Sequence, residues 1–181
     1  MHRIDNTLNW CLKQGEKGVK HKGLRKIEKN PKESNDQIQK AKSDLDTMHY
    51  LYNGNKTDWV ASTAFYAMYH SLLAILYKLG YESRNQECTI VSIEKFIKDG
   101  TISLEQEYID MIRSLQGSVE DAKSIREEMQ YTSKTSMEKE RCERLMENAK
   151  EFVNRVREVL EEINEKTFKN KKHIVNMVKK R

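Results

Sequence analysis

The sequence has little of what interrupts an α-helix. It contains one proline and seven glycines in 181 residues. Proline removes a backbone hydrogen bond, and glycine destabilises a helix interior by about 1 kcal/mol relative to alanine. Their scarcity leaves room for long helices and argues against a fold of many strands and turns. It predicts an all-α protein.

Signatures of several protein classes are missing as well. No apolar run approaches the roughly 20 residues that span a bilayer, and residues 1–10 hold no apolar stretch that could serve as a signal peptide. The sequence also lacks a glycine-rich phosphate loop, a zinc-binding pattern and a nucleophile elbow. We therefore expect no membrane association, no metal and no cofactor.

Cysteine is rare. Cys11, Cys88 and Cys142 are far apart, odd in number and without metal-ligand spacing. Because disulfides are uncommon in cytosolic proteins, the simplest interpretation is a cytoplasmic protein whose cysteines are reduced.

The positive charge lies at the two ends of the chain. The formal net charge is +5, yet residues 1–35 carry nine Lys/Arg and four Asp/Glu, and residues 164–181 carry seven Lys/Arg and one Glu. This leaves residues 36–163 with a formal charge of −6. We divide the chain into a basic N-terminal extension (1–35) with a candidate helix over 6–27, a helical bundle (36–163) and a basic tail or helix (164–181).

Apolar residues recur at helical spacing in the first segment of the bundle. Ser34 and Gln37 have the spacing of a capping box, which predicts a helix start. The helix should end at Asn53-Gly54. The apolar positions spaced by three and four residues are Ile38, Ala41, Leu45, Met48 and Tyr52.

The next segment, 59–79, is apolar on nearly every side and ends at Gly80. A helix with this pattern is buried, and Thr57 or Asp58 could cap it. Residues 81–87 form a predicted polar loop, and residues 89–97 a short helix that Asp99-Gly100 closes.

Two further helices are predicted. One starts at Ser103 and continues past Met129, with Gly117 as a possible bend. In the last, a heptad of apolar residues persists for three repeats: Cys142, Leu145, Ala149, Phe152, Val156, Val159 and Ile163. Four long amphipathic helices with short connections predict an up-and-down bundle of four to five helices. A two-stranded coiled coil is the competing architecture, but it could not bury the 59–79 helix.

Arg126 lies where the apolar face of the third long helix would place a leucine or isoleucine. An unpaired buried charge is costly, so the guanidinium needs a partner. One interpretation is that its flexible stem reaches a carboxylate or the surface. The other is an anion or phosphate site. Tyr131, five residues later, lies some 140° around a continuing helix, and the two side chains converge only if that helix ends near Gln130.

The aromatic cluster at 65–70 contains Tyr66 and His70, two further candidates. A histidine on an apolar helix is more often a satisfied core residue than a catalyst, and tyrosines there are more often packing residues. The C-terminal segment holds candidate nucleic-acid contacts, although a solubilising tail is equally common and its apolar residues suggest a helix that docks on a partner. These candidates are Lys169, Lys171, Lys172, Lys179, Lys180 and Arg181.

Three segments together resemble the HEPN family. Residues 65–70, FYAMYH, after a helix that ends in Asn53-Gly54, are similar to its second-helix signature. Residues 124–131, SIREEMQY, are similar to the segment that carries its conserved arginine, and Ala149, Phe152 and Val153 fit its last helix. The resemblance covers about residues 36–163.

The resemblance implies a four- or five-helix bundle, often a homodimer. Ribonuclease members place an Arg-x4-6-His motif at the dimer cleft for metal-independent RNA cleavage, and many are toxins paired with a minimal nucleotidyltransferase antitoxin. Arg126 matches the arginine, but Arg-x4 leads here to Tyr131. Tyrosine hydroxyls ionise near pH 10 and are poor general bases at neutral pH.

Three functions follow from these patterns. The first is a non-catalytic module that binds a nucleotide, RNA or a nucleotidyltransferase partner through Arg126, Tyr131 and Tyr66. The second is an atypical ribonuclease with Arg126, Tyr131 and His70 as catalytic candidates. The third is a helical interaction protein that binds no nucleic acid.

Overall fold

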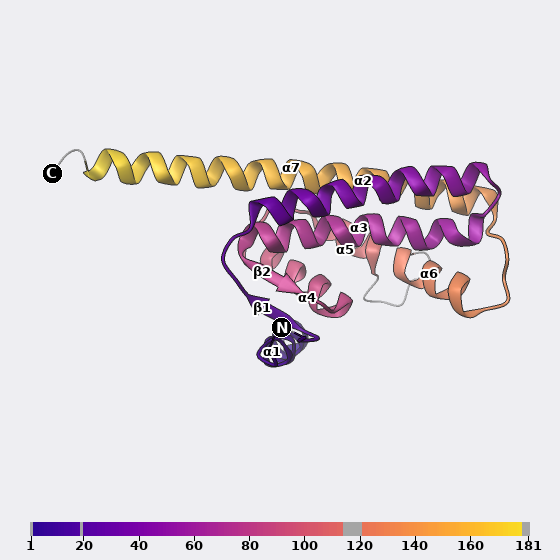
Figure 1. Cartoon of the computed structure of the whole chain (residues 1–181), viewed down its shortest axis with the longest axis horizontal. Helices are drawn as coiled ribbons and strands as arrows, with labels where there is room; N and C mark the ends of the chain where they lie inside the picture. Colours follow the sequence, from indigo (N-terminus) through magenta and orange to yellow (C-terminus); the bar gives the residue numbers. More distant parts are fainter. Residues whose placement is uncertain (1, 19, 114–120, 179–181) are drawn as a thin grey trace.

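The computed structural model describes residues 2–18, 20–113 and 121–178. Within these residues the chain forms seven helices and two short strands (Figure 1). The elements are α1 (His2–Gly15), β1 (Leu24–Lys26), α2 (Pro31–Asn53), α3 (Thr57–Leu79), β2 (Tyr81–Ser83), α4 (Gln86–Lys98), α5 (Gln106–Ile112), α6 (Ala122–Tyr131) and α7 (Lys139–Val178). The prediction of an all-α helical bundle is confirmed.

Helix α3 is the centre of the bundle. It runs beside α2, and it also packs on α7, α6 and α4 (Figure 1). All of its residues from Val60 to Leu76 are buried except Thr63 and Tyr66. Among the described residues, α3 is the one helix long and apolar enough to cross a membrane, but 78% of its apolar window is buried inside the protein. That burial is what the all-round apolar pattern predicts for a core helix.

Helix α7 carries the predicted heptad seam. Its seven seam residues, from Cys142 to Ile163, are all buried, which confirms that prediction. The helix continues to Val178, and its C-terminal end projects past the other helices (Figure 1). Lys169, Lys171 and Lys172 lie on this projecting part, but their side chains are outside the described residues, as are residues 179–181 altogether.

The predicted start of α2 is wrong by four residues, because the N-cap is Asn30 and not Ser34. The helix begins at Pro31, and Asn30 caps it by accepting a hydrogen bond from the Glu33 amide at 3.0 Å. Proline suits the first helical position because its missing N–H has no intrahelical partner there. Ser34 is instead buried, and its hydroxyl donates to the Ala74 carbonyl oxygen of α3 at 2.8 Å.

The helix expected from Ser103 past Met129 is divided. Helix α5 begins only at Gln106, and α6 is a separate helix that starts after Asp121. Asp121 accepts a hydrogen bond from the Ser124 amide at 2.9 Å, so a capping side chain interrupts the apolar periodicity. Gly117, the predicted bend, lies outside the described residues.

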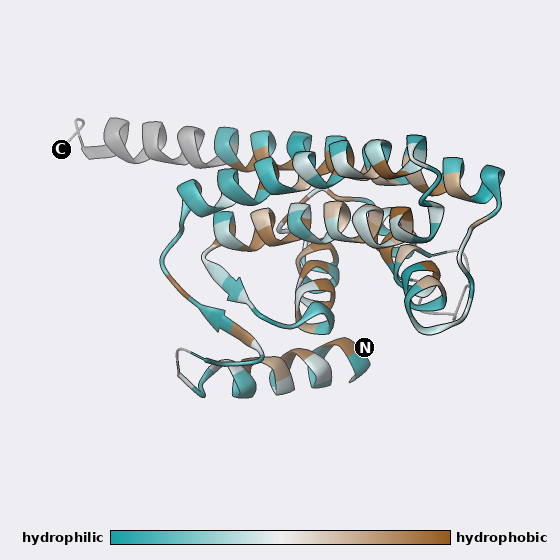
Figure 2. Cartoon of the chain, turned by 45° about the vertical axis from the view of Figure 1, so that its right-hand side comes forward, coloured by the Kyte–Doolittle hydropathy of each residue, from teal (hydrophilic) through white to brown (hydrophobic). Residues whose placement is uncertain are grey.

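The N-terminal extension differs most from expectation. Among the described residues before α2, only α1 is helical, in place of the helix expected over 6–27, and residues 24–26 form β1, which pairs antiparallel with β2 inside the predicted polar loop. A disulfide joins Cys11 of α1 to Cys88 of α4, so the prediction of reduced cysteines is wrong for this pair. In Figure 2, α1 lies apart from the bundle, and α4 stands between them.

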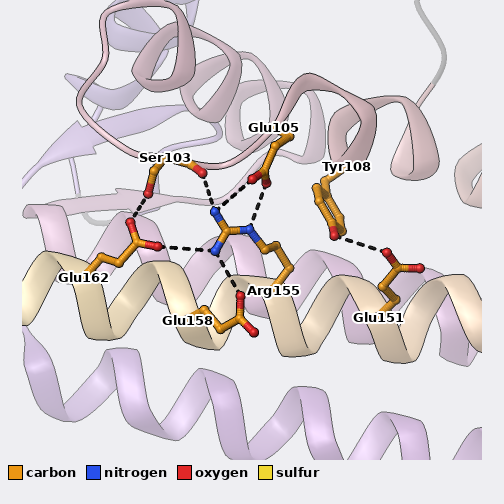
Figure 3. A network of polar contacts seen from close by, with 7 residues as sticks. All are labelled: Ser103, Glu105, Tyr108, Glu151, Arg155, Glu158 and Glu162. Atoms are coloured by element: carbon orange, nitrogen blue, oxygen red, sulfur yellow. Dashed lines mark hydrogen bonds and ion pairs between the residues drawn. The ribbon is translucent and has the colours of Figure 1, made fainter.

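A polar network fastens the α4–α5 connection to α7 (Figure 3). The guanidinium of Arg155 donates to Glu105 at 2.8 Å and to the Ser103 carbonyl oxygen at 2.6 Å, and it also contacts Glu158 and Glu162. The hydrogen bonds from Arg155 lower the pKa of Glu105 below its usual range. Charges shared among several carboxylates hold this loop better than an isolated surface pair would.

Candidate functional site

Helix α6 presents the candidate arginine to α3. Its N-terminus is fixed by Asp121, and near its other end Gln130 donates a hydrogen bond to the Ser62 hydroxyl at 3.0 Å. These two anchors orient one face of a ten-residue helix toward α3. Ala122, Ile125, Arg126 and Met129 form that buried face.

Arg126 is buried and poorly paired. It is 7% exposed, and its guanidinium carbon lies 4.9 Å from the centre of the Phe65 ring, a cation–π contact. Its described ion pair is with Glu127, at 3.4 Å, and its Nε atom is buried without a hydrogen-bond partner. A hydrogen bond of that length is weak, so much of the cost of burying this charge is not offset.

Arg113, a second buried arginine, is well paired, in contrast to Arg126. It is 8% exposed, and its guanidinium binds Glu94 at 2.7 Å and also binds Glu87. Burial raises the pKa of Glu94, and the charge of Arg113 opposes that shift. Two close carboxylates identify Arg113 as a structural ion-pair member, whereas no described residue pairs with Arg126 as closely. The signal in the sequence is Glu94, a carboxylate within the apolar segment 89–97.

Tyr131 does not converge with Arg126. Helix α6 ends at Tyr131, close to the predicted end at Gln130, yet the two side chains lie in different environments. Tyr131 is 77% exposed, whereas Arg126 is buried. Arg126 is therefore packed against α3, whereas Tyr131 is open to solvent.

His70 is held by a carboxylate from the neighbouring helix. Its Nδ1 atom lies 2.6 Å from Asp44 Oδ2 of α2, and the two side chains are 11% and 22% exposed. This bond leaves Nε2 as the second ring nitrogen. Asp44 was missed in the sequence because its pairing depends on how α2 and α3 pack.

The aromatic residues of α3 connect these groups. The Phe65 and Tyr69 rings are stacked 6.0 Å apart, and the Tyr66 and His70 rings are stacked 5.9 Å apart. Tyr66 meets Phe65 edge to face at 5.5 Å. Tyr66 thus contacts His70, which Asp44 of α2 holds, and also Phe65, over which Arg126 of α6 lies.

A hollow of about 660 Å³ lies beyond the C-terminal end of α6. Ion pairs of Glu128 with Arg141, at 2.8 Å, and with Lys134 cross its wall. None of the sequence-predicted site residues lines it. Its lining is Glu128, Met129, Lys134, Ser136, Met137, Glu138 and Arg141.

These features define a class of protein: a small α-helical module in which a poorly paired arginine packs on the central helix. Residues 34–159 match the family model of the HEPN domain, which is more than half of the chain. The chain belongs to the HEPN family, a family of nucleotide- and RNA-associated modules. No curated protein matches it.

Proposed function

We propose that this chain is a non-catalytic HEPN module that binds RNA or a nucleotide beside Arg126. The observation that supports this function is the poor pairing of the buried Arg126 guanidinium. Selection for stability alone would favour leucine there, because a buried charge gains little over an apolar residue of similar size even when it is paired. A phosphate would supply paired acceptor oxygens, whereas the described residues offer Arg126 only the Glu127 carboxylate at 3.4 Å.

Arg126→Leu should leave the free energy of unfolding unchanged or raise it, and it should abolish binding of short RNA and of ATP. Fluorescence binding and urea titration on the same variant measure both effects. Arg113→Leu is the matched control, because it strands Glu94 without its cation and should destabilise the fold. If Arg126→Leu unfolds the protein, Arg126 is structural. If it folds and binds normally, the site lies elsewhere.

Metal-independent RNA cleavage is the second candidate function. The Asp44–His70 bond favours it, because a carboxylate that fixes one imidazole nitrogen leaves the other to act as a base. The separation of Tyr131 from Arg126 argues against Tyr131 as its partner. Cleavage of RNA in EDTA by the wild type, lost in His70→Ala, would establish this activity and refute the non-catalytic proposal.

The basic C-terminal segment is proposed as the main source of nonspecific RNA affinity. Removing residues 164–181 deletes seven of the 33 cationic side chains. Binding should weaken, and the dependence of its logarithm on salt should flatten, because fewer counterions are released. Titrations at several salt concentrations measure that slope. An unchanged slope would show that the segment does not contact phosphates.

The proposed assembly is a homodimer whose partner is a minimal nucleotidyltransferase in a toxin–antitoxin-like pair. Family membership supports both parts of this proposal. Sedimentation at micromolar concentration should give twice the 21.4 kDa chain mass. A profile with only the single-chain species would contradict the dimer, and co-purification with the product of an adjacent nucleotidyltransferase gene would test the partner.

A further inference from the structure

Helix α3 has one uncovered stripe. Between Val60 and Leu76 only Thr63 and Tyr66 escape burial, and Trp59, just before them, is 56% exposed. The spacing of these three residues, four and then three, places them on one face of the helix. We call them the α3 window. Every other face of this part of α3 is covered by protein.

The two rings of the window are separated along the helix. Trp59 and Tyr66 are seven positions apart in the sequence, which corresponds to about 10.5 Å of helix rise. Thr63, between them, donates its hydroxyl hydrogen to the Val60 carbonyl oxygen at 3.0 Å, within the helix itself. The window therefore consists of two aromatic rings, Trp59 and Tyr66, with the smaller Thr63 side chain between them.

Both flanks of the window are fixed. On one side the Tyr66 ring stacks on His70, which Asp44 of α2 holds at 2.6 Å. On the other side lies α6, where Gln130 is bonded to Ser62. The Tyr66 ring, held by its contacts, therefore loses little conformational freedom when a ligand stacks on it.

We propose that the α3 window is a stacking surface for the bases of single-stranded RNA, with a phosphate of the same strand at Arg126. This inference rests on the proposed function of Arg126 and names its substrate class. Every base has a π-face that stacks on tyrosine or tryptophan, and only unpaired bases can be splayed onto such rings. The Arg126 guanidinium supplies the complementary charge one residue along α3 from Tyr66, over Phe65. A double helix would offer the window neither base face.

The test compares variants that remove one ring each. Trp59→Ala and Tyr66→Ala should each weaken the binding of a fluorescein-labelled ten-nucleotide single strand by about 5- to 150-fold, the loss of one stacked base. The salt slope should stay unchanged, because no phosphate contact is removed. Tyr50→Ala is the control: this ring is 78% exposed on α2, outside the window, and its loss should leave affinity within twofold.

Two further measurements distinguish base stacking from phosphate binding and from contacts between protein chains. The same oligonucleotide annealed to its complement, and an abasic strand of equal length, should bind wild type and Trp59→Ala alike. In a Trp10→Phe background, which leaves Trp59 as the only tryptophan, single-stranded RNA should quench the remaining fluorescence.

The outcomes distinguish this inference from the proposed function. If Arg126→Leu abolishes RNA binding while Trp59→Ala and Tyr66→Ala bind normally, the window does not stack bases and the Arg126 site stands. If all three variants bind as wild type does, both proposals fail. If Trp59→Ala converts a dimer to a single-chain species and loses duplex and abasic binding equally, the window is an interface between two copies, and the stacking proposal is overturned.

Discussion

Phe152→Ala is expected to lower the free energy of unfolding by about 3–5 kcal/mol. Phe152 is completely buried, and its ring meets Tyr108 edge to face with 5.9 Å between centres. Truncation removes apolar burial and leaves a cavity among the residues of α7, α5 and α3. It also removes an aromatic pair that contributes about 0.5–1.5 kcal/mol beyond burial.

Urea titration of the variant and the wild type measures this loss. Tyr50→Ala deletes an aromatic ring that is 78% exposed, so it should change stability by no more than about 0.5 kcal/mol. A loss below about 1 kcal/mol for Phe152→Ala would mean that the heptad seam of α7 is not the structural core, whatever its periodicity indicates.

The long helices could be predicted because their signal is local. The seam of α7 and the all-round apolar pattern of α3 depend on spacing within one segment, and burial of that face is the only way to satisfy it. Gly80 could also be placed: it ends α3 with φ of 89°, in the left-handed region that favours glycine.

The features that could not be predicted from the sequence share a different cause. Ser34 and Gln37 have the spacing of a capping box. The Ser34 hydroxyl instead donates a hydrogen bond to the Ala74 carbonyl oxygen of α3, a partner 40 residues away. Strand β1 exists because β2 pairs with it, and a three-residue strand has no periodicity of its own. Such features are set by tertiary neighbours, which a single segment does not reveal.

The candidate site divides in the same way. The burial of Arg126 was predictable, since its position continues an apolar face. Its contact with Phe65 and the bond between Asp44 and His70 were not, because each joins two helices whose packing the spacing alone leaves open. The different burial of Tyr131 and Arg126 was not predictable either, because it depends on how the last turn of α6 packs.

Reduction of the Cys11–Cys88 disulfide is expected to lower the free energy of unfolding by about 4 kcal/mol, because the bond closes a loop with a sequence separation of 77. Both sulfurs are fully buried between α1 and α4. The bond restrains the unfolded chain, and reduction releases that restraint. After reduction, β1 would still be held by its pairing with β2 and by Glu82, which binds Arg25 at 2.5 Å and Arg84 at 2.9 Å. Helix α1 loses its covalent link to α4, so it should detach from α4 before the bundle unfolds.

Urea titrations of the wild type with and without a dithiol reductant measure the effect. Cys11→Ala/Cys88→Ala is the matched control, whose midpoint should not respond to the reductant. Thiols must be counted after unfolding, because burial raises the pKa of Cys142 to about 11 and keeps it unreactive in the native protein. One thiol per unfolded, unreduced chain is the expected count. Three thiols would show that the bond does not form, and the α1–α4 contact would then depend on packing and on the Asp5–Lys95 ion pair, at 3.2 Å.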